Sequence, residues 1–224
     1  MPDIANRLVL VAGATSTSGL TCARALTAAG ARVVAVGRDA GKLDALAAEV
    51  PGISVRACDL TDESAVRDLA QQVHDSDGRV DGIVHLVGGW RGGGGLAGQS
   101  DEDYRFLERS FTALRHVSRA FDSDLRASPA GRLAIVSSTS VTRPLAGGAN
   151  YAAVKAASEA WTRAVAQGFG KSARDAGAEL SAAAVIFRVK TLAGLEDALA
   201  ARVVGLWDAD AASLNDTVVT LGDD

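Results

Sequence analysis

The chain has 224 residues, 48% of them hydrophobic, and a formal net charge of −4. This length suits one α/β domain with a substantial core, so we expect residues 1–224 to form a single domain. Lysines and arginines are spread along the chain, which argues against nucleic-acid binding, and no run reaches the ~18 apolar residues of a membrane span.

The cysteines and histidines give no sign of a metal site. Cys22 and Cys58 lie among apolar or helical residues and lack metal-ligand spacing. The amino-terminal run RLVLVAGA is too short for a signal-peptide core and leads into a small-residue loop. The sequence therefore predicts a cytoplasmic protein without bound metal or a membrane partner, in which His74, His85 and His116 are structural.

Short β-branched runs alternate with longer Ala- and Leu-rich amphipathic runs along the chain. This alternation is typical of successive βαβ units, whose parallel strands are buried on both faces. We therefore predict an α/β fold of the Rossmann type, with a doubly wound parallel sheet of about seven strands. The expected strands cover residues 7–12, 32–36, 54–57, 82–87, 133–137, 180–187 and 217–221.

The helices between these strands carry recognisable end signals. The first stops at Gly30, a residue suited to the left-handed conformation that ends many helices. Asp39 and Thr61 are suited to cap the second and third helices. Ser100 with Asp103 resembles a capping box at the start of the fourth.

The segment VLVAGATSTSGLTCARAL indicates a strand, a small-residue loop and a helix. Such a loop lets a pyrophosphate approach the N–H groups at the helix start, with Gly13 and Gly19 at its two ends. An ordinary strand-to-helix turn is the alternative. Hydroxyl groups that can bond phosphate oxygens follow Gly13, on Thr15, Ser16, Thr17 and Ser18.

The residue that follows the second strand bears on the choice of cofactor. An acidic residue there binds the 2′-hydroxyl of NAD, but this chain has Gly37 and Arg38. A guanidinium can pair with a 2′-phosphate, so NADP(H) is favoured and NAD(H) stays possible; a merely solvated Arg38 is the alternative. Asp59, with Leu60, follows the third strand where such folds hold the adenine edge, although Asp59 can equally be a turn residue.

The run GGWRGGGGLAG, residues 88–98, is the one compositional anomaly. It follows the fourth strand, and parallel strands end at the ligand crevice, so we expect it to line the site. Its candidate cofactor contacts are Val87, Gly88 and Gly89. A flexible surface linker is the alternative that glycine content alone would favour.

Tyr151 and Lys155 lie four residues apart in the Ala-rich run NYAAVKAASEAW. On a helix they share one face, and a nearby ammonium lowers the pKa of a phenol, which is near ~10 in isolation. Ser138 precedes Tyr151 at the end of the fifth strand, and its hydroxyl can hold a carbonyl oxygen in line with the phenol. The pair alone would be a surface pair in many helices; the serine and the nucleotide loop make it a candidate for proton transfer.

This layout resembles the short-chain dehydrogenase/reductase family over nearly the whole chain, with Ser138, Tyr151 and Lys155 matching its catalytic residues. The resemblance implies hydride transfer between C4 of a nicotinamide and a substrate carbon. Tyr151 would be the acid or base, and Lys155 would also hold the nicotinamide ribose. The resemblance further implies that Thr191 contacts the nicotinamide amide. It also places Ser110 at the position of the asparagine that helps the family's proton relay, so Ser110 is counted among the expected catalytic residues.

Several family landmarks are altered, including a glycine of the first loop, which is Thr17, and the NNAG run, which reads HLVG. VGGWRGG together with Ser110 resembles the quinonoid dihydropteridine reductase branch. That resemblance implies that Trp90 stacks on a flat heterocyclic or quinonoid substrate; packing of Trp90 on its own loop is the alternative. We expect an NADP(H)-dependent reductase of a small carbonyl or quinonoid compound, as a homodimer or homotetramer. The alternative is a nucleotide-binding sensor or scaffold without turnover.

Overall fold

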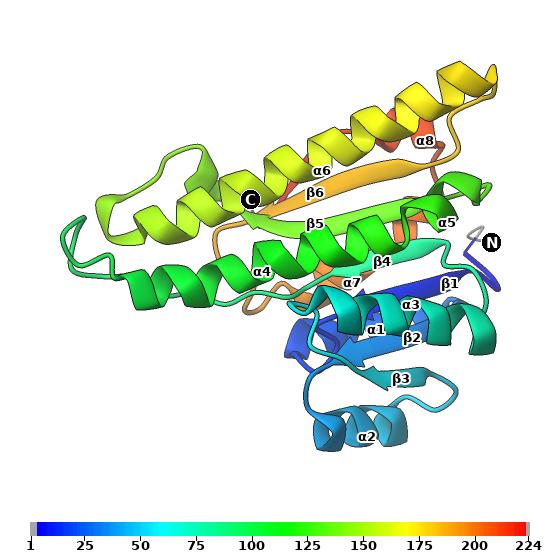
Figure 1. The fold of residues 1–224 in the computed structure, drawn as a ribbon, viewed down its shortest axis with the longest axis horizontal. Coiled ribbons are helices and arrows are strands. Elements are labelled where there is room, and N and C mark those ends of the chain that lie inside the picture. Colours follow the sequence, from blue (N-terminus) through cyan, green and yellow to red (C-terminus); the bar gives the residue numbers. More distant parts are fainter. Residues whose placement is uncertain (1–3, 223–224) are drawn as a thin grey trace.

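The computed structural model describes residues 4–222 and contains one parallel sheet between two layers of helices (Figure 1). The strand order β3-β2-β1-β4-β5-β6-β7 confirms the predicted seven-stranded, doubly wound sheet. The order reverses between β1 and β4, and ligands bind in such folds beyond the carboxyl ends of the strands at that point. The strands are β1 Leu8–Ala12, β2 Arg32–Gly37, β3 Ser54–Ala57, β4 Gly82–His85, β5 Arg132–Ser138, β6 Ala183–Val189 and β7 Thr217–Leu221.

Two predicted strands have ends that are displaced by two or more residues. The fourth was expected to cover residues 82–87, but β4 stops at His85. The sixth was expected over residues 180–187, but β6 begins at Ala183 and continues to Val189. Pairing with β5 decides both ends, because β5 pairs with β4 only as far as His85 and with β6 as far as Val189.

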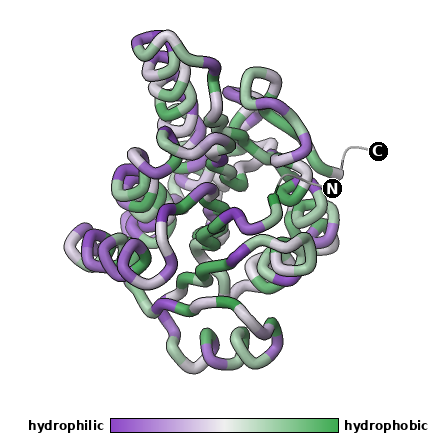
Figure 2. Tube along the Cα trace, turned by 90° about the vertical axis from the view of Figure 1, so that its right-hand side faces the viewer, coloured by the Kyte–Doolittle hydropathy of each residue, from purple (hydrophilic) through white to green (hydrophobic). Residues whose placement is uncertain are grey.

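The helices divide between the two faces of the sheet. Side chains of α1, α2 and α7 pack on one face, and those of α3, α4 and α6 pack on the other. Hydrophilic residues gather on outer helical turns, whereas the central strands are largely hydrophobic (Figure 2). The helices are α1 Thr17–Ala28, α2 Ala40–Glu49, α3 Glu63–Ser76, α4 Asp101–Ala120, α5 Asp122–Ala127, α6 Ala149–Ala176, α7 Glu196–Val204 and α8 Ala211–Leu214.

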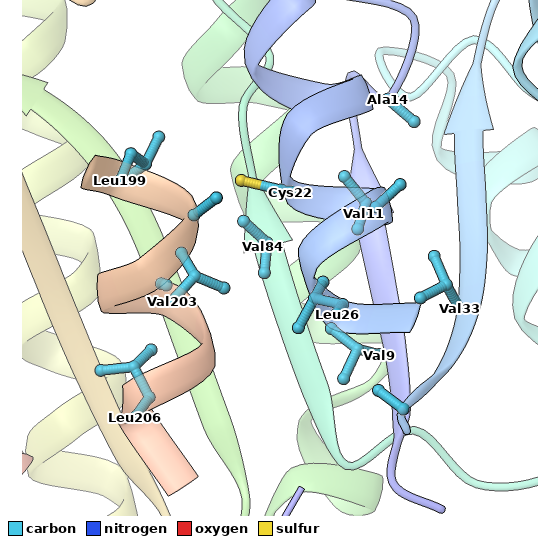
Figure 3. Close-up of a cluster of buried hydrophobic side chains, with 14 of the residues drawn as sticks. Val9, Val11, Ala14, Cys22, Leu26, Val33, Val84, Leu199, Val203 and Leu206 are labelled. Atoms are coloured by element: carbon cyan, nitrogen blue, oxygen red, sulfur yellow. The ribbon is translucent and has the colours of Figure 1, made fainter. Parts of the chain in front are cut away.

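The alternation of side chains along β1 explains how one strand supports both layers. Val9 and Val11 point toward α1 and α7, where they meet Leu26 and Val203 (Figure 3). Leu10 points to the opposite layer. Because every residue of β1 is buried, the strand is continuously hydrophobic, as parallel sheets covered on both faces require.

Three of the predicted helix-end signals are confirmed. Gly30 follows α1 with φ of +90°, the left-handed region that favours glycine. Asp39 caps α2 by accepting a hydrogen bond from the Lys42 N–H, and Ser100 caps α4 by accepting one from the Asp103 N–H. The two side-chain caps fix where α2 and α4 begin, at the carboxyl ends of the strands.

The predicted cap of the third helix is wrong. Asp62, not Thr61, caps α3, and its carboxylate accepts the N–H groups of Ser64 and Ala65. The Thr61 hydroxyl instead donates to Asp59 Oδ1 at 2.7 Å. The Thr61 hydroxyl is therefore bonded to Asp59 and does not cap the helix.

The connections that build the site extend from the carboxyl ends of the strands. The β4–α4 connection, with its glycine run, and the β5–α6 connection reach beyond the sheet at the same end of the molecule (Figure 1). Within residues 4–222, none of the helices is long and apolar enough to cross a membrane.

Candidate active site

Two adjoining cavities lie at the carboxyl ends of the strands. The larger, about 1120 Å³, is bordered by β4, the β5–α6 connection and the start of α6. The smaller, about 310 Å³, is bordered by the loops that follow β1, β2 and β3. Both include Ser16 and residues 86–89 in their walls, so an elongated ligand can extend from one cavity into the other.

The three residues of the expected catalytic group line the larger cavity together. Ser138 ends β5, and Tyr151 and Lys155 lie one turn apart near the start of α6. The Lys155 Nζ atom is 5.8 Å from the centroid of the Tyr151 ring. The fold therefore brings the serine, the phenol and the ammonium group to one cavity, as the sequence predicted.

The Ser138 hydroxyl is oriented by a residue that the sequence analysis missed. Ser140 donates two hydrogen bonds to Ser138 Oγ, from its N–H at 3.1 Å and from its own hydroxyl at 2.9 Å. A hydroxyl has two acceptor positions and one hydrogen, so the hydrogen of Ser138 is left to donate elsewhere. Ser138 can therefore give this hydrogen to a carbonyl oxygen or to the Tyr151 hydroxyl.

The electrostatics of Tyr151 differ from the sequence expectation. Burial raises the pKa of the Tyr151 phenol, and it is the Ser138 side chain, not Lys155, that opposes this rise. The prediction that a neighbouring ammonium lowers this pKa is therefore wrong for the structure, because desolvation of the phenolate dominates. At neutral pH the Tyr151 hydroxyl is protonated, which is the form that can donate a proton to a substrate oxygen.

Lys155 is held in a buried position in the wall of the larger cavity. Its Nζ atom donates to the carbonyl oxygen of Val136 at 2.8 Å. Burial lowers the pKa of Lys155 to about 8, and the Glu159 carboxylate opposes this shift. The ammonium therefore stays mainly charged at neutral pH and keeps further N–H donors for a ligand.

An ion pair that the sequence analysis missed begins on the same face of α6 as Lys155. Glu159, one turn beyond Lys155, accepts two hydrogen bonds from Arg188 of β6, from Nε at 2.8 Å and from Nη2 at 2.5 Å. Sequence spacing gives no signal that Arg188 pairs with Glu159. The pair ties α6 to β6 beneath the catalytic residues.

In the first loop, the positions of Gly13 and Gly19 leave no room for a side chain. A Cβ atom on Gly13, whose φ is +84°, would lie 3.0 Å from backbone atoms of Leu86 and Val87. A Cβ atom on Gly19 would lie 2.5 Å from the Ala14 carbonyl oxygen. Thr17, at the altered glycine position, is exposed and begins α1 after the Ser16 cap, so a side chain is accommodated there. The loop is thus a tight cradle, which fits the pyrophosphate of a dinucleotide.

The smaller cavity gathers the residues expected around the adenosine part of the cofactor. Thr15, Arg38, Asp59 and Leu60 all line it. Hydrogen bonds from Thr61 lower the pKa of Asp59, so its carboxylate is charged at neutral pH. Arg109 of α4, a residue not expected from the sequence, also lines the cavity and pairs with Asp59 at 3.2 Å.

The remaining expected site residues are divided between the two cavities. Ser110 lines the smaller cavity, and its hydroxyl donates to the Leu107 carbonyl oxygen at 2.7 Å. Thr17 and Gly19 line neither cavity, because they belong to the helix start that supports the loop. The larger cavity includes Ser16, Ser18, Val87, Gly88, Gly89 and Thr191.

His85 occupies the first position of the altered NNAG run. Its Nε2 atom lies 3.1 Å from the Ser110 carbonyl oxygen, which only accepts, so this nitrogen carries the hydrogen. Among the described residues, nothing bonds to its buried Nδ1 atom. Burial lowers the pKa of His85 to about 4, and the Lys155 charge adds to this effect. The ring is therefore neutral at neutral pH.

The low pKa of His85 predicts a loss of stability in mild acid. Below pH 6.5 the unfolded chain binds a proton at His85 that the folded protein does not bind until about pH 4. When the pH is lowered from 7 to 5, His85 should therefore lower the free energy of unfolding by about 2 kcal/mol. His85→Gln retains an amide donor for the Ser110 carbonyl and should abolish this contribution. Urea denaturation of both proteins at the two pH values measures it, and parallel losses in both would contradict it.

The glycine run is an anchored wall of the larger cavity rather than a free linker. Arg91 ties it to α4 through Asp103 at 3.1 Å. Gln99, which the sequence analysis missed, donates from Nε2 to the carbonyl oxygens of Gly93 and Gly147, both at 3.0 Å. Trp90 is 67% exposed and lines the cavity, so it does not pack the loop onto the domain.

Comparison with known sequences identifies the pattern. The family model described as short chain dehydrogenase matches residues 7–173. The "Dehydrogenase/reductase SDR family member 7B" of Bos taurus is 30% identical over 168 residues, which cover 70% of this chain and 52% of that protein. The match thus spans about half the length of this curated relative.

Solved structures share the whole fold. A metagenomic short-chain oxidoreductase in complex with NADP is similar with a TM-score of 0.83 and 26% identity, over 99% of both chains. A short-chain dehydrogenase described as putative, from Shigella flexneri and complexed with NADP, has a TM-score of 0.85 at 20% identity, over 98% of this chain and 99% of that one. The likeness at 20% identity bears on the fold alone.

Proposed function

Since the chain belongs to the short-chain dehydrogenase family and is an oxidoreductase, we propose that it reduces a small carbonyl or quinonoid compound with NADP(H). The observation that carries the proposal is the convergence of Ser138, Tyr151 and Lys155 on one cavity. When bound, the cofactor supplies a hydride at C4 of its nicotinamide. The chain's own residues then position the substrate and provide the proton.

Tyr151 gives its hydroxyl proton to the substrate oxygen as the carbonyl carbon accepts the hydride. The carbonyl double bond thereby becomes a single bond to a hydroxyl, with the hydride that a bound cofactor would supply and the proton from Tyr151. Ser138 donates its free hydrogen to the same oxygen, because Ser140 occupies its acceptor positions. The raised pKa of Tyr151 means that the phenol enters the reaction protonated, as a general acid requires.

Lys155 serves the reaction through its charge. Its ammonium places a positive charge in the wall of the cavity that holds Tyr151, where negative charge develops on the substrate oxygen during the reaction. Its remaining N–H groups would hold the nicotinamide ribose, since the Val136 carbonyl accepts only one of them. Glu159 and Arg188 position Lys155 by fixing the next turn of α6 against β6.

The cofactor would extend across both cavities. Gly13, Ser16 and Ser18 would hold the pyrophosphate, and Val87, Gly88, Gly89 and Thr191 would surround the nicotinamide half. Asp59 and Leu60 would border the adenine. Arg38 would pair with the 2′-phosphate that distinguishes NADP from NAD, and the NADP complex of the metagenomic oxidoreductase supports this choice.

Arg38→Gln should change the choice of cofactor. Loss of the guanidinium removes the partner of the 2′-phosphate, so KM for NADPH should rise roughly 10- to 100-fold while KM for NADH changes by less than about twofold. Initial rates with each cofactor at saturating substrate measure the two constants. Arg67→Gln, which removes an equal charge from the exposed surface of α3, should leave both unchanged. Equal effects on NADPH and NADH would contradict the role of Arg38.

A panel of carbonyl compounds tests the reaction itself. Diketones, quinones and a quinonoid pterin are mixed with NADPH and protein, and the absorbance of the reduced nicotinamide is followed. Oxidation of NADPH with at least one compound is expected. Trp90, exposed in the cavity wall, favours flat substrates on which its ring can stack. Measurable NADPH binding without oxidation by any compound would favour the alternative of a nucleotide-binding sensor.

We also expect the chain to form a homodimer or homotetramer through α4 and α6. These helices lie side by side (Figure 1). They bring Phe111 and Trp161 into edge contact, with ring centroids 6.2 Å apart, and Arg115 over Trp161 at 5.5 Å. Sedimentation of a monomer at micromolar concentration would contradict this assembly.

A further inference from the structure

The larger cavity is uniformly cationic among its charged groups. In the part of the chain that the structure describes, its walls include Arg143, Lys155 and Lys190 but no aspartate or glutamate. The whole chain carries a net charge of −4, so this positive edge is a local feature. A cavity lined by one sign of charge attracts ligands of the opposite sign.

Arg143 is placed to receive part of the substrate. It lies in the β5–α6 connection, between Ser138 and Tyr151, and it is exposed on the cavity wall. Ser16 and Ser18, which would hold the cofactor phosphates, lie at the start of α1, and β4 separates β1 from β5 in the sheet. Arg143 therefore belongs to a different strand connection from the loop that would hold the cofactor phosphates.

The guanidinium of Arg143 has no acidic partner among residues 4–222, unlike those of Arg91 and Arg109. Arg91 pairs with Asp103 at 3.1 Å, and Arg109 pairs with Asp59 at 3.2 Å. The planar guanidinium is suited to bind a carboxylate through two parallel hydrogen bonds. Arg143 is thus free to bind an anionic group that enters the cavity.

Two exposed apolar side chains border the same cavity. Trp90 is 67% exposed and Leu145 is 72% exposed, and both line the walls. Exposed apolar surface within a concave site is suited to cover an apolar ligand. Trp90 comes from the glycine run and Leu145 from the β5–α6 connection, so the substrate would contact both segments.

The glycine run and the β5–α6 connection are joined by hydrogen bonds. The Gly93 N–H donates to the Gly147 carbonyl oxygen at 2.7 Å, and Gln99 bridges the carbonyl oxygens of the same two residues. The Gln99 Oε1 atom also accepts the Asn150 N–H, at 3.1 Å, beside Tyr151. The glycine run, the β5–α6 connection and the start of α6 are therefore hydrogen-bonded to one another.

We propose that the substrate is an oxo acid, with a flat apolar body between a carbonyl group and a carboxylate. Arg143 binds the carboxylate, Trp90 and Leu145 cover the apolar body, and Tyr151 and Ser138 receive the carbonyl. This inference rests on the proposed reductase activity for the carbonyl end alone. The carboxylate site depends only on Arg143 and the apolar wall.

The kinetic test compares aryl oxo acids with their methyl esters. In 3-acetylbenzoate, 4-acetylbenzoate and 6-acetyl-2-naphthoate the aromatic body lies between the carbonyl and the carboxylate, at three spacings. The wild-type protein should prefer at least one acid over its ester in kcat/KM by about tenfold or more. Arg143→Gln should lower kcat/KM for that acid roughly 10- to 100-fold, mostly through KM, and change the ester by less than about twofold. Arg67→Gln, with the same change of net charge on α3, should alter neither.

A binding test separates the carboxylate site from turnover. Calorimetric titration with 2-naphthoate and 2-naphthamide is carried out on wild type and Arg143→Gln, with and without NADP⁺. Naphthoate should bind the wild type about tenfold or more tightly than it binds the variant, and naphthamide should not distinguish them.

The combined outcomes distinguish the two proposals. Equal turnover of acids and esters, with equal binding of naphthoate by both proteins, would overturn the oxo-acid inference and leave the reductase proposal standing. Discrimination of naphthoate by Arg143, with no NADPH oxidation by any carbonyl compound, would retain the carboxylate site and overturn the reductase proposal.

Discussion

Replacement of Tyr151 by phenylalanine is expected to lower kcat about 10²- to 10⁴-fold, the usual contribution of a positioned general acid. The substitution removes the hydroxyl that supplies the proton and keeps the ring beside which Lys155 is placed. NADPH affinity and the unfolding midpoint in urea should therefore change little. Single-turnover oxidation of NADPH with the preferred substrate measures the loss at the chemical step.

The chain provides a matched control, because it has two tyrosines. Tyr104 lies on α4 and is 43% exposed, outside the walls of both cavities. Tyr104→Phe removes the same atom and should retain full turnover. Substantial activity in Tyr151→Phe would transfer the acid role to another group, with Ser138 the first to examine.

Gly19→Ala is expected to lower the free energy of unfolding by about 3 kcal/mol, through overpacking at the first loop. The added Cβ would lie 2.5 Å from the Ala14 carbonyl oxygen and 2.6 Å from its Cα, and both are backbone atoms that only a shift of the loop can move. The same shift would displace the Ser16 cap, whose hydroxyl accepts the Gly19 N–H at 3.1 Å. NADPH affinity should fall at least about tenfold, because the N–H groups of the cradle lose their alignment.

Urea denaturation and a fluorescence titration with NADPH measure the two effects. Gly41→Ala is the matched control, since Gly41 is exposed in α2 and the nearest atom to an added Cβ is 3.5 Å away. That substitution should raise stability by about 0.5–1 kcal/mol, as alanine is favoured over glycine within helices. A Gly19→Ala protein as stable as the wild type, with unchanged NADPH affinity, would show that the loop does not constrain this position.

The sequence predicted the fold because its information is local and repeated. Apolar β-branched runs alternate with amphipathic ones, and a parallel sheet covered on both faces is the arrangement that buries them all. The gathering of Ser138, Tyr151 and Lys155 was predicted for a related reason. Strand ends meet at one edge of such a sheet, and residues four apart share a helix face. The strand ends were less well predicted, because hydrogen bonding to β5 sets where β4 and β6 stop.

By itself, the sequence determined the doubly wound sheet and the cavity that holds Tyr151 and Lys155, since both follow from short-range spacing. Only the tertiary structure decided the pKa values of these two groups. The high pKa of Tyr151 and the low pKa of Lys155 follow from burial, which depends on segments distant in the chain. The anchoring by Gln99 and the Glu159–Arg188 pair were likewise decided there. A hydrogen bond or a desolvated charge depends on distances in space, and spacing along a chain fixes those only within one helix or strand.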